Sequence, residues 1–121
     1  MLVVDDDDRM RNAAVKLLNH LGFDTLHARD GLEALELVES RRDRIQLILM
    51  DLSMPRMGGE EAYRELRQRG ILVPVILSSG FQETEALRRF RGQGLAGFLQ
   101  KPYKHNVLVN MLRETLAPCP E

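Results

Sequence analysis

The chain has 121 residues, of which 44% are hydrophobic and 29% charged, and its formal net charge is −1. This length and composition fit one domain with a single hydrophobic core. A nucleic-acid or membrane-surface role favours a strong basic excess, which the sequence lacks. No apolar stretch is long enough to span a membrane. The one cysteine, Cys119, cannot form an internal disulfide. We therefore expect a cytoplasmic domain that binds neither nucleic acid nor membrane.

The first half of the chain alternates apolar segments with helical patterns. Strands are expected at residues 2–4, 22–28 and 45–50. The spacing of apolar residues predicts one helix marked by Ala14, Leu17, Leu18 and Leu21, and a second helix at residues 31–40. The runs at 2–4 and 45–50 are almost entirely apolar, which is typical of strands that are buried on both faces.

The second half of the chain continues this alternation. Strands are expected at residues 73–77 and 97–99. Helices are marked by Ala62, Tyr63 and Leu66, by Ala86, Leu87 and Phe90, and by Val107, Leu108, Met111 and Leu112. The (βα)₅ order predicts an α/β fold, a doubly wound five-stranded parallel sheet with helices on both faces. We assign residues 1–117 to this domain and residues 118–121 to a tail.

Polar residues stand where four of the expected strands end. In a doubly wound sheet, ligands bind beyond the carboxyl ends of the strands, at the point where the strand order reverses. These ends carry Asp5 and Asp6, Asp51, Ser78 and Ser79, and Lys101. The sequence therefore predicts three carboxylates, two hydroxyl groups and one ammonium group on one edge of the sheet.

The acidic cluster predicts a binding site for a divalent cation. Two carboxylates about 4 Å apart repel by roughly 4 kcal/mol near a protein surface. A Mg²⁺ ion, which prefers oxygen ligands, would offset this repulsion at Asp5, Asp6 and Asp51. A metal beside an ammonium group suits phosphoryl chemistry, in which a carboxylate can act as the nucleophile and form an acyl phosphate. The neighbouring Asp7 or Asp8 is expected to cap the first helix or to lie in its first turn.

Four segments, LVVDD, LILMDLSMPRMGG, PVILSSG and FLQKPY, occur in this order. Together they resemble the receiver domains of two-component response regulators, and the resemblance covers essentially the whole chain. It implies a flavodoxin-like receiver fold in which Asp51 is phosphorylated. It also implies that Mg²⁺ is held by Asp5, Asp6, Asp51 and the backbone carbonyl of Ser53.

The same resemblance implies a conformational switch. Lys101 would contact the phosphoryl group, and Pro102 would follow a cis peptide bond. Ser79 would be the switch hydroxyl, and Phe98 stands at the aromatic switch position, where it lacks the hydroxyl group of the commoner Tyr. Phosphorylation would then alter the surface formed by the fourth helix, fifth strand and fifth helix. Gly58 and Gly59 replace a frequent Asp-Gly pair, a change expected to matter only for turn geometry.

The resemblance names a histidine kinase or a phosphotransfer protein as the partner. The segment MPRMGGEEAYRELR is most similar to the receivers of hybrid sensor histidine kinases. A stand-alone response regulator is the alternative. Such a domain is a signalling module and not a turnover enzyme. A phosphatase of the haloacid dehalogenase type would need Asp where Ser53 stands. A flavodoxin-like electron carrier would need a phosphate-binding loop where this chain has four aspartates.

Overall fold

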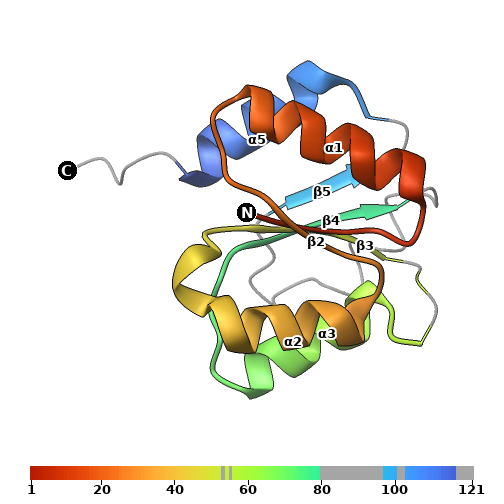
Figure 1. The fold of residues 1–121 in the computed structure, drawn as a ribbon, viewed down its shortest axis with the longest axis vertical. Coiled ribbons are helices and arrows are strands. Elements are labelled where there is room, and N and C mark those ends of the chain that lie inside the picture. The colour runs from red at the N-terminus through yellow and green to blue at the C-terminus, as the bar shows by residue number, and fades with distance from the viewer. Residues whose placement is uncertain (53, 55, 80–96, 101–102, 117–121) are drawn as a thin grey trace.

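The computed structural model describes residues 1–52, 54, 56–79, 97–100 and 103–116 (Figure 1). Its strands are β1 (Leu2–Val4), β2 (Leu26–Ala28), β3 (Ile48–Asp51), β4 (Val75–Ser79) and β5 (Gly97–Gln100). Its helices are α1 (Asp8–His20), α2 (Gly31–Arg41), the short 3₁₀ helix η1 (Arg42–Arg44), α3 (Gly59–Gln68) and α5 (His105–Leu116). The helix expected around Ala86, Leu87 and Phe90 and the tail at residues 118–121 lie outside the described residues.

The five strands form one parallel sheet in the order β2-β1-β3-β4-β5. Helices α1 and α5 cover one face of this sheet, and α2 and α3 cover the other (Figure 1). This arrangement confirms the predicted doubly wound α/β fold. The chain runs from β1 to the edge strand β2 and then returns to β3 on the other side of β1. The strand order therefore reverses between β1 and β3.

The sheet separates two hydrophobic clusters, one on each face. Leu2, Val4, Ile48 and Met50 belong to one cluster, together with residues of α2 and α3. Val3, Leu47 and Leu49 belong to the other, together with residues of α1 and α5. Successive strand residues point to opposite faces, so a strand covered on both faces needs apolar residues at every position. This explains the uninterrupted apolar runs of the central strands.

Strand β2 is shorter than the alternating pattern of residues 22–28 predicted. The Phe23 amide donates to the Leu18 carbonyl, and Gly22 has a φ of 95°. This left-handed turn, which glycine adopts readily, ends α1 and delays pairing until Leu26. Two of the apolar residues that mark the expected helices are exposed: Leu21 follows the end of α1 and is 40% exposed, and Val107 on α5 is 43% exposed.

The helices give no sign of a membrane span. Within the part of the chain that the structure describes, none is both long enough and apolar enough to cross a bilayer.

Candidate metal centre

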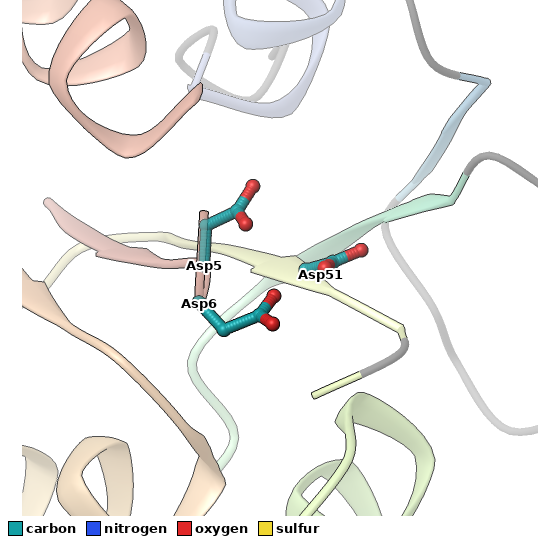
Figure 2. A group of neighbouring side chains, drawn as sticks. All are labelled: Asp5, Asp6 and Asp51. Atoms are coloured by element: carbon teal, nitrogen blue, oxygen red, sulfur yellow. The ribbon is translucent and has the colours of Figure 1, made fainter. Parts of the chain in front are cut away.

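Three carboxylates meet at the carboxyl end of the sheet, beside the reversal of strand order. Asp5 and Asp6 follow β1, and Asp51 is the last residue of the neighbouring β3. Each offers a carboxylate oxygen, and these oxygens all lie within 4.8 Å of one another. The carboxylates project beyond the strand ends (Figure 2). Asp5 and Asp51 are buried, whereas Asp6 is exposed. The structure thus brings together the three acidic residues that the sequence placed at one site.

Strand pairing explains why these carboxylates are close. Val4 and Met50 are partners in the parallel register of β1 and β3, so the next residues, Asp5 and Asp51, lie side by side at the end of the sheet. The Asp5 amide still donates to the Ala28 carbonyl of β2, at 3.1 Å. This hydrogen bond holds the backbone of Asp5 at the end of the sheet, beside Asp51. Oxygen donors alone, in an acidic cluster, fit a hard cation such as Mg²⁺.

The loop after β1 is ordered by its own aspartates. The Asp7 amide donates to Asp5 Oδ1 at 2.9 Å, which closes a tight turn. Asp7 Oδ1 then accepts from the amides of Arg9 and Met10, at 2.9 and 3.3 Å. Asp7 is therefore the N-cap of α1, and Asp8 lies in the first turn. This confirms the predicted helix start and separates the capping aspartates from the pair at the cluster.

Arg11 is a buried residue near this site that the sequence did not single out. It is 8% exposed, its NH1 group donates to the Asp5 carbonyl oxygen at 2.9 Å, and its NH2 group pairs with Asp8. The sequence signal for this residue was Asp8, three positions earlier, because residues three apart face each other on a helix and can form an ion pair. Arg11 shares the inward face of α1 with Ala14 and Leu18. It therefore ties the start of α1 to the backbone of Asp5.

The other predicted site residues are only partly described. Ser79 is the last residue of β4 and is buried, and its register partner is Gln100 of β5. Phe98 is the partner of Leu77, and its side chain belongs to the hydrophobic cluster on the α2 and α3 face. Ser53, Lys101 and Pro102 lie outside the described residues.

The end of the loop after β3 lies beside its beginning, at the carboxyl end of β3. The Leu52 amide donates to the Ser78 carbonyl at 2.8 Å, and the Gly59 amide donates to the Leu52 carbonyl at 2.9 Å. A Cβ atom on Gly59 would lie 2.5 Å from the Asp51 carbonyl oxygen. Gly59 thus permits close contact between α3 and the strand end. Gly58 is the N-cap of α3 and Gly59 its first residue, and the effect of having Gly58 in place of the frequent Asp stays a prediction.

A five-stranded parallel sheet in this order, with an acidic cluster at the reversal, defines the class of CheY-like receiver folds. The sequence matches the response regulator receiver domain family over residues 1–113. The chain belongs to this family.

The similar proteins include both sensor kinases and response regulators. The sensor kinase CckA of Brucella abortus is 32% identical over 116 residues, which are 96% of this chain and 12% of CckA. The response regulator MprA of Mycobacterium ulcerans is also 32% identical over 116 residues, which are 96% of this chain and 49% of MprA. The chain thus spans half or less of the length of these curated relatives.

A solved structure supports the fold. The crystal structure of the CheX-CheY-BeF3-Mg²⁺ complex from Borrelia burgdorferi matches with a TM-score of 0.90 at 20% identity. The match covers 97% of this chain and 88% of that chain.

Proposed function

We propose that this receiver domain accepts a phosphoryl group on Asp51 from a histidine kinase or a phosphotransfer protein. The observation that carries this proposal is the convergence of the Asp5, Asp6 and Asp51 oxygens within 4.8 Å at the reversal of strand order. In the proposed site, Asp5, Asp6, Asp51 and the Ser53 carbonyl hold Mg²⁺. The ion would neutralise charge on the phosphoryl oxygens and on the carboxylates around them.

The proposed reaction is a nucleophilic displacement at phosphorus. A carboxylate oxygen of Asp51 forms the new P–O bond, and the P–N bond of the donor phosphohistidine breaks. The electron pair of that bond stays on the imidazole nitrogen, so the donor leaves as histidine and Asp51 becomes an acyl phosphate. The nucleophile in this step is the ionised carboxylate of Asp51.

The proposal assigns the remaining residues to the response. The Lys101 ammonium group pairs with the phosphoryl oxygens, and the Ser79 hydroxyl donates a hydrogen bond to them. Movement of Ser79 changes the space beside β4, and Phe98 fills it by changing rotamer. The support for this route is that Ser79 ends β4 and that Phe98 pairs with Leu77 of the same strand. A partner would then read the surface that includes β5 and α5.

We place the domain in the cytoplasm, in a signalling role without substrate turnover. We further propose that it belongs to a hybrid sensor histidine kinase, which its similarity to CckA supports. A stand-alone response regulator is the alternative.

The phosphoacceptor is tested by incubating the protein with acetyl phosphate and Mg²⁺ and measuring intact mass. We expect one added phosphoryl group in the wild type and none in Asp51→Asn. Chelation of Mg²⁺ should stop labelling of the wild type. Asp43→Asn, a change at an exposed position in η1, is the matched control and should label normally. Labelling of Asp51→Asn at the wild-type level would disprove the assignment.

The switch is tested by comparing NMR spectra of the wild type and Ser79→Ala with and without beryllofluoride, a mimic of the phosphoryl group. The alanine methyl group cannot donate the hydrogen bond, so the shift changes around Phe98 should be lost while those around Asp51 remain. Changes at Phe98 equal to those of the wild type would rule out the coupling through Ser79.

A further inference from the structure

Arg56, in the loop between β3 and α3, has an unfavourable backbone conformation. Its φ is 64°, and it is the one non-glycine residue with a positive φ among the residues that the structure describes. A long side chain in the left-handed region is costly unless the surrounding structure maintains it. Glycine would adopt this conformation without cost. The arginine side chain should therefore supply something at this position that glycine could not.

The Arg56 side chain binds a buried carboxylate at the start of α2. Its Nε and NH2 groups both donate to Asp30 Oδ2, at 2.9 and 2.6 Å. The Asp30 side chain is only 7% exposed, whereas that of Arg56 is 60% exposed. The second oxygen, Asp30 Oδ1, accepts from the Glu33 amide at 2.9 Å and so caps α2. The two residues, which we call the Arg56–Asp30 clamp, join elements 26 positions apart.

A backbone contact lies beside this ion pair. The Gly31 amide donates to the Met57 carbonyl at 3.0 Å. A Cβ atom on Gly31 would lie 2.8 Å from the same carbonyl oxygen and 2.7 Å from Met57 Cγ. Only glycine therefore lets the loop approach the start of α2 this closely. The loop is held against α2 by two successive residues, through the side chain of Arg56 and the backbone of Met57.

The other end of the same loop segment packs against the backbone of Asp51 and Leu52. Two residues after Met57, the Gly59 amide donates to the Leu52 carbonyl, and the Gly59 Cα packs where a Cβ would meet the Asp51 carbonyl oxygen. Residues 56–59 therefore bridge the start of α2 and the backbone of Asp51. If the end at α2 were released, the segment would still be held by Leu52 and by α3, and a shift of Gly59 would act on the Asp51 carbonyl against which it packs.

We infer that the Arg56–Asp30 clamp positions Asp51 for the metal site, although neither residue is among the proposed ligands. This inference rests on the proposed function, because it assumes that the acidic cluster binds Mg²⁺. Arg56 and Asp30 are positioning residues, which keep the loop against α2 so that the Asp51 carboxylate faces Asp5 and Asp6. The stabilising contact explains why a strained arginine occupies a position that suits glycine.

The test measures Mg²⁺ affinity by NMR titration in variants that open the clamp. Arg56→Gly removes the ion pair and also the backbone strain, and Asp30→Asn removes the charge while keeping a good capping residue. Residues that support metal ligands typically change affinity by 10-fold to 100-fold when replaced, so we expect about 10-fold weaker binding in each variant. The double variant should bind no more weakly than either single variant, because both remove the same interaction.

The matched control is Arg69→Gln, which breaks the Arg69 pair with Glu39, another link between α2 and the end of α3. We expect its Mg²⁺ affinity to stay within about twofold of the wild type, because this pair is exposed and distant from the loop. Arg56→Lys keeps the charge without the planar fork of donors and should give an intermediate loss. This conservative variant also serves if Arg56→Gly fails to fold. Wild-type affinity in Arg56→Gly and Asp30→Asn would overturn the inference.

Amide hydrogen exchange separates failure of the clamp from failure of the proposed metal site. Without Mg²⁺, the Gly31 and Gly59 amides should exchange at least about 10-fold faster in Arg56→Gly than in the wild type, because both hydrogen bonds depend on the loop position. If the wild type binds no Mg²⁺, the proposed metal site is wrong. Positioning of the Asp51 backbone is then judged by these two amides alone. Unchanged exchange at Gly59 would disprove it.

Discussion

The two loops that carry the acidic cluster are ordered in different ways. The loop after β1 is short, and its side-chain hydrogen bonds are local: Asp5 accepts from the Asp7 amide, and Asp7 caps the helix that follows. The loop after β3 is longer, and it is fixed by residues from elsewhere in the chain, through Arg56 to Asp30 and through Met57 to Gly31. Local loops can be interpreted from sequence spacing, whereas a loop fixed by distant residues depends on the topology that brings them together.

The largest expected effect comes from the close approach in the longer loop. Gly59→Ala places a Cβ 2.5 Å from the Asp51 carbonyl oxygen. The backbone must move, because no side chain there can rotate away. We expect the free energy of unfolding to fall by about 3 kcal/mol, at the upper end of the range for overpacking. Urea denaturation of the two proteins measures this difference.

Gly97→Ala is the control for Gly59→Ala, because the added Cβ also meets an atom at 2.5 Å, the sulfur of Met111. Methionine is flexible and can repack, so the free energy of unfolding should fall by less than about 1 kcal/mol. Equal losses in the two variants would show that crowding alone matters and that the contact with the Asp51 backbone is not special.

The local loop gives a smaller expected effect. Asp7→Ala removes the N-cap of α1, whose oxygen accepts from the Arg9 and Met10 amides. Loss of such a cap typically costs about 1 kcal/mol of the free energy of unfolding. Asp7→Asn keeps the cap and removes one negative charge beside Asp6. The free energy of unfolding of Asp7→Asn should be at least as large as that of the wild type. A loss in Asp7→Asn as large as that in Asp7→Ala would contradict the capping role.

The same contrast explains what the sequence could predict. The alternation of apolar runs with helical spacing was enough for the sheet, and the position of Asp5, Asp6 and Asp51 after apolar runs was enough for the acidic cluster. Both depend on local pattern and on the rule that parallel strands end at one edge. The N-cap at Asp7 was also a local signal.

The features that the sequence did not predict depend on three-dimensional packing. The pairing of Arg56 with Asp30 follows only once α2 and the β3–α3 loop are neighbours. The need for glycine at position 59 depends on how closely α3 approaches the strand end, which no spacing encodes. The start of β2 was placed too early because the apolar alternation continued through Gly22, whose left-handed backbone belongs to the end of α1.

The smallest expected effect is a pH dependence in the longer loop. Burial raises the pKa of Asp30, but hydrogen bonds from the Glu33 and Leu32 amides and from Arg56, with the charge of Arg56, outweigh it and lower the pKa below its ordinary value of 3.8. The ionised carboxylate therefore stabilises the folded state above pH 3.8, and this contribution is lost as the pH falls through the lower, folded-state pKa.

The variant Asp30→Asn lacks this titration. Its deficit in the free energy of unfolding should be present at neutral pH and should shrink below pH 3.8. Because the Arg56 partner is largely exposed, we expect a smaller deficit than that of Asp7→Ala. Urea denaturation at successively lower pH measures it, and Asp43→Asn, which changes an exposed carboxylate of η1, is the control. A deficit that stays constant through the acid range would show that Asp30 acts through its shape and hydrogen bonds and that its charge contributes nothing to holding the loop.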